Sequence, residues 1–133
     1  MTRAFLDTVG LLALWSARDQ WHEAAVARFE QLAADGAEFW TTTYILLECG
    51  NAAARTPFRR DVVELREHLR AVGNLIEPTE GDCAAAWSAY QRSDFGEAGI
   101  VDQVSFAVMR RVGIEQAFTN DRHFREAGFV TLF

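Results

Sequence analysis

Lysine is absent from this sequence of 133 residues, and all thirteen basic residues are arginine. This absence excludes chemistry that needs a lysine amine: P-loop phosphate binding, Schiff bases, and the lysine-assisted aspartyl-phosphate sites of dehalogenase-like and receiver domains. The last exclusion is informative, because the chain opens with a strand-like run that ends in Asp7-Thr8. That pattern would otherwise suggest an aspartyl phosphate, so the Asp7 carboxylate needs another explanation.

Cysteine and long apolar runs are also scarce. The two cysteines, Cys49 and Cys83, form no paired motif, which fits reduced thiols in a cytosolic protein. No apolar segment approaches the roughly 20 residues that span a bilayer, and the N-terminus does not have the pattern of a signal peptide. We therefore expect a cytoplasmic protein that does not engage a membrane.

Positive charge is in deficit. The formal net charge is −6 and the pI is near 5.0, which argues against binding nucleic acid through overall charge, since affinity for phosphates usually rests on Lys and Arg. A local group of arginines or bound cations can still supply a positive field. The length fits one domain, residues 1–133, with a sizeable core.

The apolar pattern alternates between strand-like and helix-like periods along the whole chain. It predicts strands over 4–7, 38–42, 74–77, 115–119 and 129–133. It predicts helices over 9–16, 21–34, 43–55, 58–72, 81–92, 100–112 and 122–127. Residues 93–99 are predicted to form a loop, and Thr8 is predicted to cap the first helix. Such alternation indicates an α/β fold with a parallel sheet of about five strands and helices on both faces.

Four acids follow the predicted strands or begin the helices after them. Asp7 ends the first strand, Asp102 opens a helix, and Asp121 follows the fourth strand. Glu48 lies one turn into an apolar helix, where a lone buried carboxylate costs several kcal/mol. Each has a structural alternative: Asp7 and Asp121 as helix caps, Asp102 as a partner of a helix dipole, and Glu48 as the partner of an arginine such as Arg55.

Together the four acids favour a metal site. The carboxyl ends of parallel strands lie along one edge of a sheet, where ligands bind. Carboxylates brought together there repel and raise one another's pKa values. A cluster of oxygen ligands suits a hard cation, Mg²⁺ or Mn²⁺.

The sequence resembles the PIN-domain family, and within it the VapC-like toxin ribonucleases of bacterial toxin–antitoxin pairs. The motifs that carry the resemblance are Phe5-Leu6-Asp7-Thr8, Leu47-Glu48 with Asn51, Asp102 opening an amphipathic helix, and Thr119-Asn120-Asp121 followed by Phe124. The resemblance implies a three-layer α/β/α fold and a Mg²⁺- or Mn²⁺-dependent endoribonuclease. It also implies a homodimer that is inhibited by a small antitoxin protein.

By this resemblance Asp7, Glu48, Asp102 and Asp121 form the catalytic acidic cluster. Asp7 and Asp102 are expected to bind metal directly. Glu48 and Asp121 are expected to bind a second ion, to hold metal-bound water, or to act as a base. Thr119 matches a Ser or Thr that supports the metal or its water.

Several other residues have weaker assignments. Asn120 is a further supporting candidate, and Asp94 and Glu97 either contribute polar groups near the site or are simply solvated. Arg55 and Arg122 lie nearest the acids in sequence and are candidates for contact with RNA phosphate or with the antitoxin. The three histidines have no ligand spacing and are interpreted as structural: His22, His68 and His123.

The four tryptophans are interpreted mainly as core. Trp15 and Trp21 flank a polar break, where an exposed patch can receive a partner helix.

Two alternatives to the ribonuclease remain at this stage. One is a catalytically silent PIN-like module that binds protein or RNA, although the presence of all four acids argues against it. The other is a metal-dependent phosphoesterase that acts on a different substrate. An open basic groove would favour RNA, and a closed pocket would favour a small metabolite.

Overall fold

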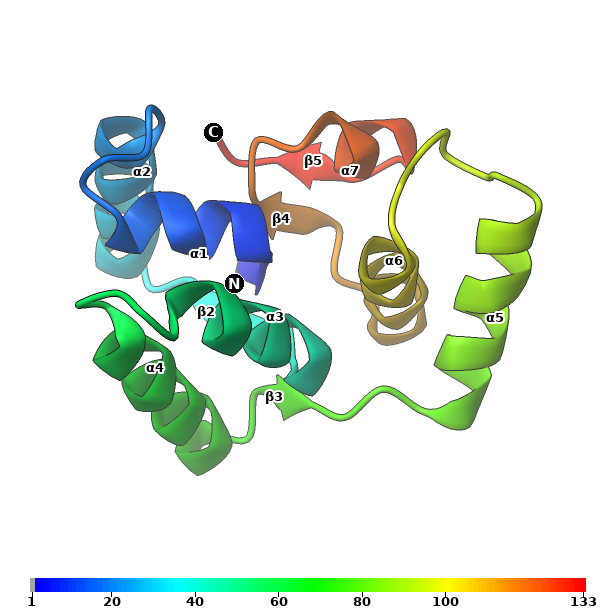
Figure 1. The fold of residues 1–133 in the computed structure, drawn as a ribbon, viewed down its shortest axis with the longest axis horizontal. Helices are drawn as coiled ribbons and strands as arrows, with labels where there is room; N and C mark the ends of the chain where they lie inside the picture. Colours follow the sequence, from blue (N-terminus) through cyan, green and yellow to red (C-terminus); the bar gives the residue numbers. More distant parts are fainter. Residues whose placement is uncertain (1) are drawn as a thin grey trace.

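A computed structural model describes residues 2–133, which form a five-stranded sheet and seven helices (Figure 1). The strands are β1 (Arg3–Leu6), β2 (Glu38–Thr42), β3 (Leu75–Ile76), β4 (Gln116–Phe118) and β5 (Val130–Thr131). The helices are α1 (Thr8–Trp15), α2 (His22–Ala34), α3 (Thr43–Ala53), α4 (Arg59–Val72), α5 (Glu80–Gln91), α6 (Ile100–Val112) and α7 (Arg122–Glu126).

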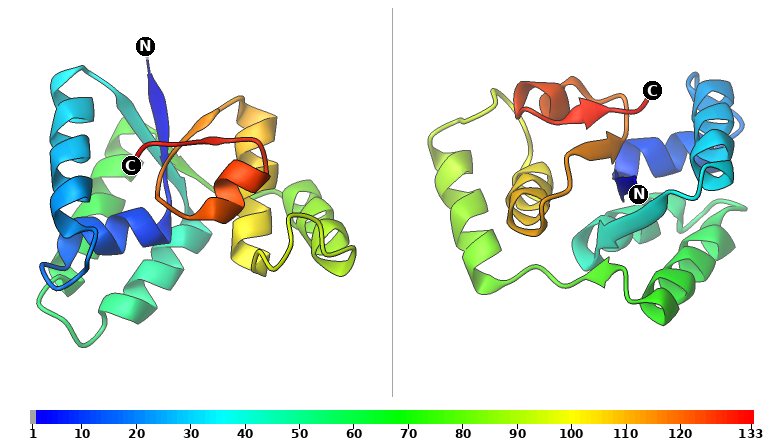
Figure 2. Two further views of the ribbon diagram at one scale, coloured as in Figure 1. Left: turned by 90° about the horizontal axis from the view of Figure 1, so that it is seen from above. Right: turned by 180° about the vertical axis from the view of Figure 1, so that it is seen from behind.

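The sheet is parallel throughout, with strand order β3-β2-β1-β4-β5. The chain moves from β1 outward to β3, then crosses back to β4 and β5. Because crossovers between parallel strands are right-handed, the helices before β3 cover one face and those after it the other. Figure 2 shows α2 and α4 on one side of the sheet and α5, α6 and α7 on the other. This arrangement confirms the predicted three-layer α/β/α fold.

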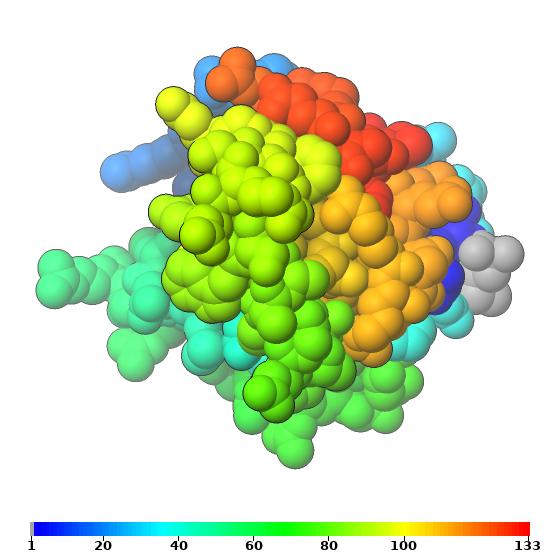
Figure 3. All heavy atoms as spheres, turned by 90° about the vertical axis from the view of Figure 1, so that its right-hand side faces the viewer, coloured from blue at the N-terminus to red at the C-terminus, as the bar shows by residue number. Residues whose placement is uncertain are grey.

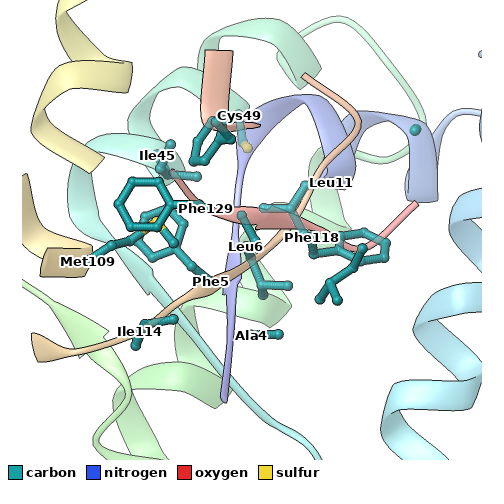
Figure 4. Close-up of a cluster of buried hydrophobic side chains, with 14 of the residues drawn as sticks. Ala4, Phe5, Leu6, Leu11, Ile45, Cys49, Met109, Ile114, Phe118 and Phe129 are labelled. Atoms are coloured by element: carbon teal, nitrogen blue, oxygen red, sulfur yellow. The ribbon is translucent and has the colours of Figure 1, made fainter. Parts of the chain in front are cut away.

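The core alternates across β1, as the period of a strand requires. Phe5 points toward Met109 and Ile114, whereas Leu6 points toward Leu11 and Phe118 on the other side (Figure 4). Since both faces of β1 are buried, its apolar run is continuous rather than alternating. β1 is therefore the central strand, and whatever follows it lies at the centre of the sheet's carboxyl edge.

At that edge, Gly10 allows α1 to approach the end of β4 closely. A Cβ atom on Gly10 would lie 2.0 Å from the carbonyl oxygen of Phe118, far inside any real contact. The first turn of α1 therefore lies directly against the end of β4. This close approach positions the residue before α1 beside the residues that follow Phe118.

α5 is the outermost element on its side and packs against α6 (Figures 1 and 3). A capping box begins α5, because Thr79 accepts from the Asp82 amide at 3.0 Å and Asp82 accepts from the Thr79 amide at 2.9 Å. Asp82 also binds the guanidinium of Arg111 on α6, with contacts of 2.8–3.1 Å. This ion pair fastens the two helices together.

Several predicted boundaries are wrong by a few residues. β1 ends at Leu6, and Asp7, not Thr8, caps the first helix through the amide of Val9. α4 begins at Arg59, and β5 covers only Val130–Thr131 because β4 is its one neighbour in the sheet. The strands predicted over 74–77 and 115–119 are also shorter than predicted, and cover Leu75–Ile76 and Gln116–Phe118.

The interpretation of the tryptophans as core is wrong for two of them. Trp21 is 46% exposed, before α2, and Trp87 is 57% exposed on α5, where it contacts Tyr90 edge to face. Trp15 and Trp40 pack against the core. None of the helices formed by residues 2–133 combines the length and apolar content that crossing a bilayer requires.

Candidate metal and catalytic site

Asp7 lies at the junction of β1 and α1, and only 1% of its surface is exposed. Its Oδ2 atom accepts from the amide of Val9 at 3.4 Å and from the hydroxyl of Thr119 at 2.8 Å. The second contact spans 112 residues of sequence and depends on the close approach at Gly10. One carboxylate oxygen is thereby fixed by neutral donors, and no basic side chain forms an ion pair with Asp7 among residues 2–133.

The surroundings of Asp7 disfavour its charged form. Burial, and to a smaller extent the charges of Asp102 and Asp121, raise the pKa of the Asp7 carboxyl to about 8. The Thr119 hydroxyl works in the opposite direction, since a donor stabilises the ionised oxygen. A buried carboxylate is stable only when something positive compensates it, and the protein itself provides only hydrogen bonds.

The turn after β4 positions three further polar groups. The Thr119 hydroxyl, which is fully buried, accepts from the Asp121 amide at 3.1 Å. Asp121 then caps α7, because its Oδ1 atom accepts from the His123 amide at 2.9 Å. The same oxygen lies 3.0 Å from Nδ1 of His123. The short sequence from 119 to 123 thus fixes a hydroxyl, a carboxylate and an imidazole on one turn.

Asp102 lies in the first turn of α6, where Gly99 begins the helix without a side-chain cap. Burial raises the pKa of Asp102 to about 6, with the charges of Asp121 and Glu48 as further causes. One ligand atom from each of Asp102, Asp121 and His123 lies within 4.8 Å of the others. These three side chains are partly exposed, so the cluster faces solvent on one side.

Glu48 comes from α3 and completes the group of acids. Its Oε1 atom accepts from the hydroxyl of Thr8 at 2.6 Å. In the described part of the chain its partner is thus Thr8 and not Arg55, which the sequence suggested as an alternative. Glu48 lies near enough to raise the pKa of Asp102, so the four acids share one electrostatic neighbourhood.

His123 lies beside Asp121, and the sequence does not predict this contact. The sequence predicts a structural histidine here, because no second histidine or cysteine stands at ligand spacing. The available signal was the Asp121-x-His123 pair directly after a strand. A helix cap turns the chain so that both side chains face the same point.

The remaining candidates form no side-chain hydrogen bond or ion pair with the four acids in the described part of the chain. Arg122 is 71% exposed with a loose contact of 3.9 Å to Glu126, and Arg55 is also exposed. Asp94 pairs with Arg92 at 2.7 Å. Asn120 is half-buried between Thr119 and Asp121, and Glu97 is exposed in the loop before α6.

The donor set fits a divalent cation. Four carboxyl groups gather here, and burial together with the charges of neighbouring acids raises the pKa values of Asp7 and Asp102. Carboxylate oxygens are the ligands of hard cations, and an imidazole extends the choice to first-row transition metals. What the arrangement can do chemically is hold such an ion at the sheet edge with one side open to a ligand.

Comparison with known proteins agrees with this architecture. Over 92 residues the chain is 38% identical to the 23S rRNA-specific endonuclease VapC20 of Mycobacterium tuberculosis. That alignment covers 68% of this chain and 63% of the relative, so the match spans less than two thirds of the relative's length.

Solved structures extend the likeness along the chain. The crystal structure of Mycobacterium tuberculosis VapC20, described as a sarcin–ricin loop cleaving toxin, has a TM-score of 0.76 at 30% identity and covers 96% of each chain. FitAcB from Neisseria gonorrhoeae has a TM-score of 0.67 at 16% identity over 98% of this chain and 96% of that chain, which shows a common fold. The PIN domain model matches residues 4–130. The chain therefore belongs to the PIN domain family, as its acidic motifs predicted.

Proposed function

We propose that this protein is a metal-dependent endoribonuclease that hydrolyses RNA phosphodiester bonds, with Mg²⁺ or Mn²⁺ as its cofactor. The observation that carries the proposal is the buried, uncompensated Asp7 carboxyl beside Asp102 and Asp121 at the carboxyl edge of the sheet. Similarity to a protein named as an rRNA endonuclease supports RNA as the substrate class. A single catalytic domain over residues 1–133 is part of this proposal.

In this proposal Asp7 and Asp102 hold the metal directly, and Asp121 and Glu48 complete the site. A bound divalent ion lowers the pKa of a water and offsets the added negative charge of the phosphate. Thr119 prevents rotation of the Asp7 carboxylate, because its hydroxyl donates to Oδ2. Asn120 is a weaker supporting residue on the same turn.

Glu48 is the proposed base. Thr8 occupies its Oε1 atom, which fixes the carboxylate so that Oε2 can accept a proton from the attacking water. Asp7 suits this role less well, because it is buried and its carboxyl is proposed to bind the metal. Asp121 is the alternative base, at the more exposed side of the cluster.

The proposal also includes a biological setting. The relative with a TM-score of 0.76 is described as a toxin, so we propose that this chain is the toxin of a toxin–antitoxin pair in the cytoplasm. It would act as a homodimer and be inhibited by a small antitoxin protein. Arg55 and Arg122 are exposed, and among residues 2–133 neither forms an ion pair shorter than 3.9 Å. Both guanidinium groups are therefore available to contact RNA phosphate or acidic residues of that antitoxin.

A cleavage assay tests the enzymatic part. The purified chain is incubated with a ribosomal RNA fragment that contains the sarcin–ricin loop, and with a shuffled RNA of the same composition, in Mn²⁺, in Mg²⁺ and in a chelator. Specific cleavage that requires metal and is lost in Asp102→Asn supports the proposal. Binding of RNA without cleavage would favour the silent module instead, and hydrolysis of small phosphodiesters alone would favour a different phosphoesterase.

A further inference from the structure

We infer that His123 is a direct nitrogen ligand of the metal, and that it gives the site a preference for Mn²⁺ over Mg²⁺. This inference rests on the proposed function, since it concerns the same cation. It goes beyond that function because it adds a ligand of a different chemical type and predicts which ion the site selects.

The first support is the spacing of the donor atoms. Adjacent ligands of a six-coordinate ion, each about 2.1 Å from the metal, lie about 3 Å apart, and opposite ligands lie about 4.2 Å apart. Nδ1 of His123 lies 3.0 Å from Oδ1 of Asp121. With Asp102 included, the donor atoms of the three residues all lie within 4.8 Å of one another. The separation of the Asp121 and His123 atoms suits adjacent ligands of one ion, and the 4.8 Å bound places a carboxylate oxygen of Asp102 beside them.

The second support is that the backbone fixes the pair. The Asp121 amide donates to Thr119, and the His123 amide donates to Asp121. These bonds hold the Asp121 carboxylate in place without help from the imidazole ring. A ring needed only to orient Asp121 would duplicate what the helix cap already does.

The third support is accessibility. The side chains of His123 and Asp121 are 20% and 19% exposed, whereas Asp7 is 1% exposed. An ion held between them has protein oxygens on the inner side and solvent on the outer side. The open positions of a catalytic metal are required on that outer side.

The expected selectivity follows from the chemistry of the ligands. Mg²⁺ prefers oxygen and binds an imidazole poorly, while first-row transition ions accept a mixture of imidazole and carboxylate. Among these ions, Mn²⁺ retains the six-coordinate geometry and the preference for carboxylate that the acids impose. Replacing the nitrogen should therefore weaken Mn²⁺ binding more than Mg²⁺ binding.

Electron paramagnetic resonance of Mn²⁺ tests the inference without measuring activity. The signal of free Mn²⁺ reports affinity, Mg²⁺ competition reports selectivity, and electron spin-echo modulation detects a directly bound ¹⁴N nucleus. The proteins are the wild type, His123→Ala, His123→Gln and Asp102→Asn. The matched control is His68→Ala, on an exposed histidine of α4. His123→Gln keeps a hydrogen-bond donor for Asp121 but removes the ring nitrogen, and its melting curve checks folding.

We expect a ¹⁴N coupling in the wild type and in His68→Ala, and its loss in both His123 variants. Mn²⁺ affinity in those variants should fall by about tenfold or more, with a smaller fall for Mg²⁺. Wild-type Mn²⁺ affinity in His123→Gln, or a wild type without ¹⁴N coupling, would overturn the ligand role and leave the ring as an orienting group. If Asp102→Asn then still abolishes Mn²⁺ binding, the proposed metal site stands and only this inference falls. A wild type that binds no Mn²⁺ overturns both.

Discussion

Two buried aspartates, Asp7 and Asp82, occupy similar positions but differ in their partners and in the direction of their pKa shifts. Both lie at the start of a helix, and they are 1% and 5% exposed. Hydrogen bonds from Arg111 lower the pKa of Asp82, with help from Thr79. Burial and neighbouring carboxylates raise the pKa of Asp7 to about 8. One acid is compensated within the protein, and for the other we propose that a cation from outside compensates it.

The contrast explains why burial alone does not identify a functional acid. Asp82 has a partner that binds it through two nitrogens, and this ion pair fastens α5 to α6. Among residues 2–133, the partners of the Asp7 carboxylate are a hydroxyl and a backbone amide. A carboxylate left without a positive partner at a sheet edge costs stability, and this cost supports the proposed role of Asp7 in binding a cation.

The largest expected difference between the two acids is in catalysis. Asp7→Asn should reduce RNA cleavage by about 100-fold or more, because a metal ligand is lost. Asp82→Asn should cleave at nearly the wild-type rate under conditions where it is folded. Initial rates on one RNA substrate measure both variants. Equal losses in the two variants would remove the distinction.

The loss of stability should be larger for Asp82→Asn than for Asp7→Asn, the reverse of the order expected for catalysis. Asp82→Asn should lower the free energy of unfolding by about 1–3 kcal/mol, less than for a fully buried pair because Arg111 is 43% exposed. Asp7→Asn, measured without metal, should unfold no more easily than the wild type, since asparagine carries no charge to bury. Urea unfolding measures both. A strongly destabilised Asp7→Asn would mean that Asp7 is chiefly structural.

The pH dependence of stability should separate the acids by sign. Asp7 binds its proton more tightly when folded, so metal-free stability should fall as pH rises from about 4 to about 8. Asp102 adds to this trend up to about pH 6. Asp82 acts oppositely, because its lowered pKa gives stability that is lost on acidification below the ordinary aspartate pKa of 3.8.

Melting temperatures across this range, with Asp7→Asn for comparison, check the assignment. The variant should lose part of the decline toward pH 8 but keep the contribution of Asp102. An identical decline in wild type and variant would show that Asp7 does not titrate there.

The smallest expected effect concerns Thr119. Thr119→Val removes the donor that lowers the pKa of Asp7 and should weaken Mn²⁺ affinity about tenfold at neutral pH. Thr119→Ser keeps the hydroxyl and is the matched control. Calorimetric titration of both variants decides between a role for the hydroxyl and a role for packing alone.

The sequence predicted the fold because its signals were local. The run Ala4–Leu6 is apolar on both sides, which indicates a central strand, and glycines end several helices, among them Gly73 and Gly113 with positive φ. The edge strands were predicted too long, because pairing with a neighbour decides their length. Nothing in the residues 129–133 indicates that β5 has one neighbour only.

The four candidate acids could be identified from the sequence, but the contacts that surround them could not. A strand end can be recognised from local pattern, whereas the Thr119 contact to Asp7 depends on Gly10 allowing two distant segments to touch. The position of His123 beside Asp121 could not be predicted, because it follows from a helix cap rather than from periodic spacing. Trp87 was misjudged because hydrophobicity does not show which face of α5 meets α6.

The most direct test of this account is thermal unfolding of wild type and Asp7→Asn with and without Mn²⁺. Mn²⁺ at about 100 times its dissociation constant should stabilise the wild type by about 2.7 kcal/mol, because it compensates carboxylates that otherwise repel. The gain should be much smaller in Asp7→Asn. An unchanged wild type, or an equal gain in both proteins, would contradict the claim that Asp7 is buried in order to bind a cation.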